Sequence, residues 1–330
     1  MARILILGAG SMGTAFSFPC SENNHEVSIV GTHLENDFID KINSSKKHPT
    51  LDCDIPKNVH FYKNEKLKEV FDKKIDLIAV AVISKGIEWA SIELSKVLKN
   101  NIPILILTKG LSINNNNYEV LAHKMERILK KNGIKETNIT GAGGPCLARG
   151  LANKTHTYVV YANKDINIAK QIKKLVSTKY YHVSVTNDLI GVEVCAAIKN
   201  IFSMAIGSTK NLNTAAGLIQ QSINEMIFFT EKLKGKKETV IGLAGIADLY
   251  VSADGGRNSM MGRYLGEGMS FKEAKKSKMP NHTIEGADLV LEIGSKIKKD
   301  FEDKSLPLMI SVIDCISNDK KLKIDWDNFN

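Results

Sequence analysis

The feature that most restricts the fold of this chain is a glycine-rich turn close to its first residue. The turn GAGSMG follows the apolar run Arg3 to Leu7 and opens the helical stretch Met12 to Asn23. Glycines at this spacing allow a tight strand-to-helix turn, a bare backbone that a pyrophosphate can approach, and close packing of the helix on the strand. We therefore expect a dinucleotide beside Gly8, Gly10, Ser11, Met12 and Gly13.

The pattern that follows this turn is typical of a parallel sheet covered by helices. Up to about residue 160, short β-branched runs alternate with amphipathic stretches, as they do in βαβ units. The polar run Asn114 to Asn117 is expected to be a loop. The predicted strands are Arg3 to Leu7, Glu26 to Gly31, Asp76 to Val82, Ile102 to Leu107, Asn138 to Thr140, Tyr158 to Tyr161 and His182 to Val185.

The rest of the chain has a different pattern. After Asp188, long stretches of helical period are separated by glycines, and β-branched alternation becomes rare. Because domains average roughly 150 residues, a chain of 330 residues suggests two domains. The expected fold class is α/β, with an N-terminal Rossmann-type doubly wound sheet in residues 1–188 and a C-terminal all-α domain in residues 189–330.

The net charge of +9 at pH 7 does not by itself indicate nucleic-acid binding. The lysines are spread along the chain as short pairs, such as Lys46-Lys47 and Lys130-Lys131, without one basic stripe that contains aromatic residues. We expect a lysine-rich surface that attracts anionic small molecules, and no nucleic-acid partner.

Membrane, export and metal signals are missing from the sequence. The longest apolar stretch, Leu77 to Ile83, has seven residues, whereas a helix needs about 20 to cross a bilayer. The first residues lead directly into a strand without the apolar region of a secretory signal. The five cysteines form no CxxC pair and the eight histidines form no HExxH motif. These observations predict a cytoplasmic protein without a membrane span or a metal.

The end of the second predicted strand bears on which dinucleotide is bound. An NAD site usually has an acidic residue there, which accepts hydrogen bonds from the ribose hydroxyls. Here the strand ends Val30-Gly31-Thr32-His33, so that acid is missing and no arginine replaces it for a 2′-phosphate. His33 is a partial candidate for this position, and both NAD and NADP stay open.

Lys109 is a candidate ligand-binding residue. It stands two residues after the strand that ends at Leu107, at the carboxyl end of a parallel strand, where open α/β sheets bind ligands. The following residue, Gly110, favours a tight turn that would direct the lysine toward a ligand.

Lys199 is a candidate acid and base. It is the only charged residue between Val194 and Thr209, and its helical neighbours include Cys195, Ala196 and Phe202. A charged amine is expensive on an apolar helix face, and such an environment makes a lysine ready to exchange a proton near neutral pH. The alternative is a structural lysine whose amine reaches water past small neighbours.

Two segments rich in small residues carry further charged side chains. The segment GLAGIADL places Asp248 in an apolar setting, where it could orient a catalytic amine or act as a helix cap. In the segment GGRN, Arg257 offers a forked donor to a phosphate or carboxylate, and Asn258 adds a neutral hydrogen bond.

In their order along the chain, these motifs resemble the NAD(P)-dependent glycerol-3-phosphate dehydrogenase family. The resemblance implies a Rossmann domain and a helical domain with the active site in the cleft between them. It implies reversible hydride transfer between a nicotinamide and C2 of dihydroxyacetone phosphate, feeding glycerophospholipid synthesis, in a homodimer. The matching blocks are GAGSMGTA from Gly8, LTKGL from Leu107, GGPCLA from Gly143, GVEVCAAIKN from Gly191, GLAGIADL from Gly242, GGRN from Gly255 and IEG from Ile284.

The resemblance also implies a role for each matched residue. Lys199 would exchange a proton with the alkoxide at C2, Lys109 would polarise and position the substrate, and Asp248 would orient Lys199. The residues implied to bind substrate are Lys109, Gly144, Cys146, Lys199, Asp248, Ser252, Arg257 and Asn258. Besides the glycine-rich turn and His33, those implied to bind the cofactor are Lys109, Ala148, Arg257 and Glu285.

Several positions depart from the family pattern, and two other functions compete with it. The family often has an aromatic residue, a serine and a glutamate where this chain has Met12, Cys146 and Gly150, which affects the polar detail around the nicotinamide. The first competing function is a β-hydroxyacid dehydrogenase, which also combines a glycine-rich turn with a helical lysine. The second is a non-enzymatic dinucleotide sensor, which would have no use for Lys199 among apolar neighbours.

Overall fold

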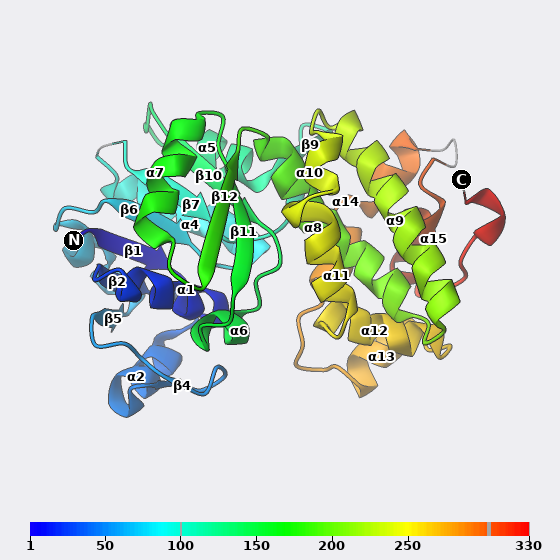
Figure 1. Ribbon diagram of the computed structural model, residues 1–330, viewed down its shortest axis with the longest axis horizontal. Helices are drawn as coiled ribbons and strands as arrows, with labels where there is room; N and C mark the ends of the chain where they lie inside the picture. The colour runs from blue at the N-terminus through cyan, green and yellow to red at the C-terminus, as the bar shows by residue number, and fades with distance from the viewer. Residues whose placement is uncertain (100, 302–304, 330) are drawn as a thin grey trace. The chain divides into compact units, whose positions relative to one another are not determined.

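The computed structural model of the chain describes residues 1–99, 101–301 and 305–329 (Figure 1). These residues form two compact units, the first from Met1–Lys109 with Leu121–Leu189 and the second from Gly110–Val120 with Ile190–Asn330. The segment Gly110–Val120 therefore lies inside the sequence range 1–188 but packs with the second unit. The domain limits at residues 188 and 189 stay a prediction.

The first unit contains an eight-stranded sheet with the strand order β12-β11-β10-β7-β6-β1-β2-β5. Within the described residues, six neighbouring pairs are parallel and the pair β10 and β11 is antiparallel. The seven predicted strands are all found, β1 with the predicted ends and the other six with shifted ends. The strands are β1 (Arg3–Leu7), β2 (Glu26–Val30), β5 (Val59–Tyr62), β6 (Leu77–Val80), β7 (Pro103–Ile106), β10 (Asn138–Gly143), β11 (Thr157–Ala162) and β12 (Tyr181–Thr186).

The sheet differs from the sequence prediction in two places, although the α/β fold class is confirmed. Strand β5 was not predicted, because its four residues alternate between buried and more exposed, which is a weak signal at an edge. Strand β11 runs antiparallel because its connection from β10 contains only the five-residue helix α6 (Ala148–Ala152). A parallel crossover normally needs a longer helix to carry the chain back along the sheet.

Helices cover both faces of this sheet, so alternate residues of the central strand are buried on opposite sides. On one side, Ile4 and Ile6 of β1 belong to a core cluster with Phe16 of α1 and Ile172 of α7. On the other side, α4 packs on α5 (Figure 1). The helices of this unit are α1 (Ser11–Glu22), α2 (Asn36–Ser45), α3 (Leu67–Phe71), α4 (Ile87–Val97), α5 (Leu121–Lys131), α6 and α7 (Ile166–Val176). Two further strands, β3 (Lys47–His48) and β4 (Cys53–Asp54), form a small separate hairpin.

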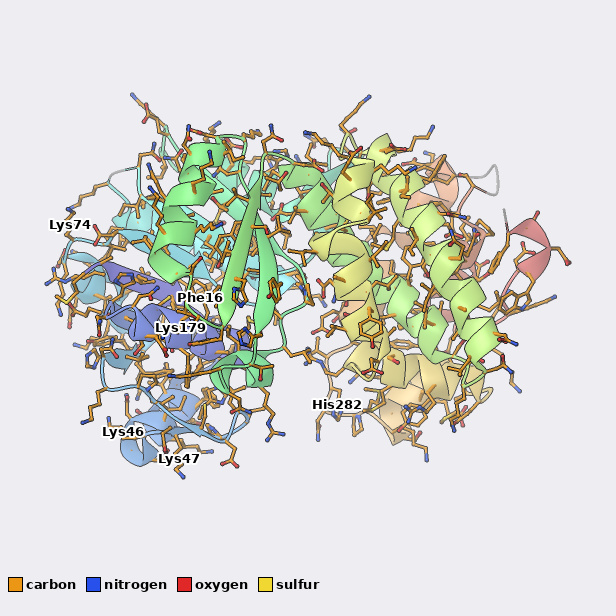
Figure 2. All side chains as sticks on the ribbon, in the orientation of Figure 1. Phe16, Lys46, Lys47, Lys74, Lys179 and His282 are labelled. Carbon is orange, nitrogen blue, oxygen red and sulfur yellow. The ribbon has the colours of Figure 1, made fainter. Side chains whose placement is uncertain are left out.

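Several lysines of the first unit are exposed at its surface. Figure 2 labels four of them, with Lys46 and Lys47 next to each other and Lys74 and Lys179 elsewhere on the unit, and all four are exposed. These exposed lysines therefore lie in three separate segments of the unit.

The described residues of the second unit form helices and one hairpin. One of these helices, α8 (Leu189–Gly207), is long and apolar enough to cross a membrane, but it is almost entirely buried inside the structure, as in the core helix of a folded domain. The other helices are α9 (Leu212–Lys232), α10 (Lys237–Val240), α11 (Asp248–Ala253), α12 (Arg257–Gly266), α13 (Phe271–Ser277), α14 (Glu285–Asp300) and α15 (Pro307–Ser317). A π-helical turn, Leu243–Ala247, leads into α11.

The hairpin of the second unit is formed by β8 (Leu111–Asn114) and β9 (Asn117–Val120). Its two-residue turn uses Asn115 and Asn116 with φ of 47° and 60°, a left-handed conformation that asparagine tolerates. Tyr118 attaches the hairpin to the unit, because its ring makes an edge contact with Phe229 at a centroid distance of 5.4 Å. The predicted loop at Asn114 to Asn117 is thus the turn of a hairpin.

A buried carboxylate also holds two helices of the second unit together. Glu225 of α9 is 1% exposed and accepts hydrogen bonds from the backbone N–H groups of Leu308 and Met309 at 2.7 and 2.8 Å. These N–H groups belong to the first turn of α15, where a helix has no internal acceptors for them. Burial raises the pKa of Glu225 to about 7, although these donors and the Gln221 amide oppose the shift.

Candidate active site

The glycine-rich turn of the first unit has the geometry that its sequence predicts. Gly8 has φ of +105°, and a Cβ atom there would lie 2.8 Å from the carbonyl oxygen of Ala81. A Cβ on Gly13 would collide with the Gly8 carbonyl oxygen. Gly10 is different, because the nearest atom to a Cβ there would be Glu35 Oε1 at 3.9 Å. The protein's own packing therefore requires Gly8 and Gly13, whereas Gly10 leaves bare backbone available to a ligand.

This turn stands at the carboxyl edge of the sheet, next to the N-terminus of α1. Strand β1 lies between β2 and β6, where the strand order reverses, and open α/β sheets bind ligands at such a position. Ser11 and Met12 begin α1, so their backbone N–H groups belong to the helix terminus that favours an anionic pyrophosphate.

Lys109 extends the same edge of the sheet. It follows β7, is half-buried, and donates a hydrogen bond from Nζ to the carbonyl oxygen of Gly144 at 3.3 Å. Gly144 has φ of +107° and follows β10, the parallel neighbour of β7. Cys146 is partly exposed in the loop that leads into α6, and Ala148 is the first residue of that helix. The predicted residues of this segment thus follow neighbouring strand ends.

The end of β2 carries an acidic residue that the sequence analysis missed. Oε2 of Glu35 accepts hydrogen bonds from the backbone N–H groups of Thr32 at 2.7 Å and Ala9 at 3.3 Å. His33, the predicted candidate at this position, is exposed, and its ring centroid lies 6.1 Å from that of Trp89. The signal in the sequence is Gly31 followed four residues later by an acid. The prediction considered only Val30 to His33 and therefore did not include Glu35.

In the second unit, Lys199 lies at the centre of a buried polar cluster. Its Nζ donates to Asp248 Oδ1 at 2.8 Å and also to Ser252 Oγ. The side chains of Lys199 and Asp248 are only 7% and 3% exposed. Asp248 and Ser252 lie four residues apart on α11 and therefore share one face of that helix. The structure thus brings Lys199 together with Asp248 and Ser252, two predicted residues that lie about 50 positions later in the sequence.

A buried ion pair of this kind is weak evidence for a stabilising role. Removing two charges from water costs several kcal/mol per ion by general estimates, and their mutual attraction often does little more than repay that cost. Burial and precise hydrogen bonding do, however, hold an amine in one position and exclude water from it. The cluster is therefore suited to proton exchange with a bound ligand.

Asn258 joins three helices next to this cluster. Its Nδ2 donates to Asn200 Oδ1 on α8 at 3.0 Å, and its Oδ1 accepts from the backbone N–H of Gly286 on α14 at 2.8 Å. Close packing permits these bonds, because a Cβ on Gly286 would lie 2.5 Å from the Asn200 carbonyl oxygen. The oxygen and one amide hydrogen of Asn258 are thus already bonded within the protein, and the second amide hydrogen is the group that it can offer to a ligand.

Arg257 and Glu285 form a more exposed pair at the starts of α12 and α14. An Nη2 hydrogen bond joins the guanidinium to Glu285 Oε1, and the side chains are 50% and 38% exposed. A guanidinium has five N–H donors, so this bond leaves others for an anionic ligand. Among the residues that the structure describes, no group of three or more His, Cys, Asp or Glu side chains could hold a metal ion.

Comparison with protein families gives matches over nearly the whole chain. The family model for the NAD-dependent glycerol-3-phosphate dehydrogenase N-terminus matches residues 3–169. The model for the NAD-dependent glycerol-3-phosphate dehydrogenase C-terminus matches residues 188–325.

Individual proteins give the same result. The chain is 32% identical over 311 residues to an NADP(+)-dependent glycerol-3-phosphate dehydrogenase of Archaeoglobus fulgidus, covering 90% of this chain and 91% of that protein. It is 31% identical over 318 residues to a glycerol-3-phosphate dehydrogenase [NAD(P)+] of Francisella philomiragia, covering 94% and 91%. The glycerol-3-phosphate dehydrogenase structure from Coxiella burnetii matches with a TM-score of 0.83 at 25% identity, covering 97% of this chain and 96% of that chain.

Proposed function

The chain belongs to the NAD-dependent glycerol-3-phosphate dehydrogenase family, and from this membership we propose how its residues divide the reaction. The protein is an oxidoreductase that interconverts dihydroxyacetone phosphate and sn-glycerol 3-phosphate with NAD or NADP as the cofactor. The bound cofactor supplies or accepts the hydride at C2 of the substrate. The protein must bind both molecules, exclude water and move one proton to or from the C2 oxygen.

Lys199 carries the proton in this proposal, and its buried contact with Asp248 is the observation that supports the role best. During reduction the amine gives a proton to the developing alkoxide, and during oxidation it takes the proton back. Asp248 Oδ1, at 2.8 Å, holds the amine in place and compensates its charge. Ser252 offers the amine a second fixed contact. We therefore assign Lys199 and Asp248 as catalytic residues and Ser252 as part of the substrate site.

Further donors bind the phosphorylated substrate. A dianionic phosphate needs positive or N–H donors, which Arg257, the Asn258 amide and Lys109 supply. We place Lys109 in both the substrate site and the cofactor site, and we assign Gly144 and Cys146 to the substrate site. Glu285 acts through Arg257, to which it is bonded, and also toward the cofactor.

The first unit holds the dinucleotide in this proposal. Gly8, Gly10 and Gly13 place the pyrophosphate at the start of α1, beside Ser11 and Met12. The residues fit such a ligand, because Gly10 leaves open backbone while its two neighbouring glycines are needed for packing. Ala148 contributes to the nicotinamide side, and His33 lies at the end of β2 near the adenosine side.

The proposed reaction also suggests a cellular role for the protein. The product, a glycerol phosphate, supplies the backbone of glycerophospholipids, so we propose that the enzyme feeds their synthesis. We also propose a cytoplasmic homodimer, since most soluble enzymes of this kind form symmetric oligomers. A sedimentation measurement of the purified chain checks the dimer, and a single species of 36.4 kDa would contradict it.

An activity assay separates this function from its two competitors. The purified protein is mixed with NADH or NADPH and either dihydroxyacetone phosphate or a 3-oxo acid, and loss of the reduced cofactor is followed. We expect turnover with dihydroxyacetone phosphate. Turnover with only the 3-oxo acid would identify a β-hydroxyacid dehydrogenase instead. Dinucleotide binding without turnover of any substrate would identify a sensor.

A further inference from the structure

The carboxylate at the end of β2 comes from a residue beyond the strand. Glu35 lies four positions after Gly31 and directly before α2. Its Oε2 accepts from the N–H of Thr32 at 2.7 Å and from the N–H of Ala9, inside the glycine-rich turn, at 3.3 Å. One acidic side chain thus joins the end of β2 to the loop that follows β1.

The lack of a side chain at Gly31 makes this arrangement possible. A Cβ on Gly31 would lie 3.3 Å from Glu35 Cβ and 3.4 Å from Glu35 Oε2, and it would also collide with Ile39. An acid at position 31 itself would therefore not fit. The space above the glycine is filled by the Glu35 side chain, which reaches back from the start of α2.

The carboxylate of Glu35 points away from the helix that it precedes. Short side chains such as Ser, Thr, Asp and Asn at this position accept hydrogen bonds from the helix's own first N–H groups. Glu35 makes no such capping bond. Its carboxylate is directed to the glycine-rich turn, where Oε1 lies 3.9 Å from the position that a Gly10 Cβ would have. Oε1 therefore faces the bare backbone assigned to the dinucleotide.

We propose that Glu35 selects the dinucleotide, by accepting a hydrogen bond from the 2′-hydroxyl of the adenosine ribose and repelling a 2′-phosphate. The inference rests on the proposed function in one respect, namely that the glycine-rich turn binds NAD or NADP. A carboxylate accepts from a hydroxyl, whereas beside a dianionic phosphate it opposes binding. The His33 ring, the nearby candidate for a favourable contact with that phosphate, packs toward Trp89 at 6.1 Å. The site therefore prefers NAD(H).

Binding of the two cofactors without substrate tests this assignment. Dissociation constants for NADH and NADPH are measured by calorimetry on the wild type, Glu35→Gln and Asp37→Asn. The glutamine keeps the size of the side chain and removes its charge. Asp37 is the matched control, because it is an exposed acid in the first turn of the same helix.

We expect the wild type to bind NADH at least about tenfold more tightly than NADPH. Glu35→Gln should reduce this ratio at least about fivefold, mainly because NADPH binding improves, and Asp37→Asn should leave the ratio within about twofold. Equal or tighter wild-type binding of NADPH would overturn the assignment, as would an unchanged ratio in Glu35→Gln. If neither dinucleotide binds, the proposed function fails as well, so the two failures are distinguishable.

Discussion

The sheet edge of the first unit and the polar cluster of the second present different kinds of groups to a ligand. At the sheet edge they are mostly backbone atoms at strand ends and at the start of α1, with Gly10 kept bare. In the second unit they are side chains from α8 and α11, with Lys199 and Asp248 almost fully buried. Backbone suits the recognition of a large anionic cofactor, whereas proton exchange requires one titratable side chain in a fixed position.

The largest effect that separates the two regions is expected from Lys199→Ala. Loss of the proton donor should lower kcat/KM by about 10² to 10⁴-fold, while NADH affinity stays within about threefold, because the dinucleotide is assigned to the first unit. Asp248 would be left buried without its cation, so the free energy of unfolding should fall by about 3 kcal/mol. Steady-state kinetics, cofactor titration and chemical denaturation measure these three quantities.

Lys210→Ala is the matched control for this variant. Lys210 is exposed and lies 4.0 Å from Glu267, so its removal should change neither kinetics nor stability appreciably. Wild-type turnover by Lys199→Ala would remove the proton-donor role and leave Lys199 a structural residue.

The next largest effect concerns the exposed ion pair rather than the buried one. Arg257→Ala should weaken use of the phosphorylated substrate by roughly 2 to 4 kcal/mol of transition-state stabilisation, because a charged donor to the phosphate is lost. The measurement is kcat/KM for dihydroxyacetone phosphate. Arg263→Ala, an exposed arginine later in the same helix, is the control. An unchanged kcat/KM in Arg257→Ala would exclude its phosphate role.

Two glycines of the sheet edge should respond differently to the same substitution. Gly13→Ala puts a Cβ against the Gly8 carbonyl oxygen and 3.1 Å from Ala81 Cβ, so the free energy of unfolding should fall by about 1 to 3 kcal/mol. Gly10→Ala meets no atom closer than 3.9 Å. Gly10→Ala should lower the free energy of unfolding by less than about 1 kcal/mol, because alanine is a poorer helix cap than glycine. The same variant should raise the dissociation constant of NADH about tenfold. Equal effects of both variants on stability would contradict this division.

The smallest effect compares two buried carboxylates of the second unit, Glu225 and Asp248. Glu225 is held by N–H donors, whereas Asp248 is paired with the Lys199 amine, and burial raises the pKa of Glu225 to about 7. A carboxyl whose folded pKa is raised stabilises the fold most when protonated, so this contribution is lost as pH rises from 4.5 toward 7. Relative to Glu225→Gln, the wild type should gain about 1 to 2 kcal/mol between about pH 7.5 and about pH 5. Urea unfolding at both pH values measures it, and an opposite trend would refute it.

The sequence was sufficient to predict local features of the fold. It was insufficient to predict contacts between segments that are brought together only when the chain folds. The strand and turn from Arg3 to Gly13 could be predicted because one short segment contains all the residues involved. The asparagine pair at 115 and 116 was interpreted as part of a loop, since its role as a hairpin turn depends on the pairing of β8 with β9. The reversal of β11 depends on the path of the chain after β10, which periodicity does not record.

The candidate site shows the same limit. The apolar neighbours of Lys199 were visible in the sequence, but its bonds to Asp248 and Ser252 join α8 to α11 and became visible only in the structure. Glu35 was missed because a glycine four residues earlier makes the space for its side chain, and that relation is geometric. Residue types and spacing thus identified candidates, while the structure identified which of them touch.

The most direct test of the account measures NADH affinity and the single-turnover rate of hydride transfer at saturating NADH, on both Gly10→Ala and Lys199→Ala. We expect Gly10→Ala to lose affinity and keep the rate, and Lys199→Ala to keep affinity and lose the rate. If both variants changed the same quantity to a similar extent, the separation between cofactor binding at the sheet edge and proton transfer in the helical unit would be contradicted.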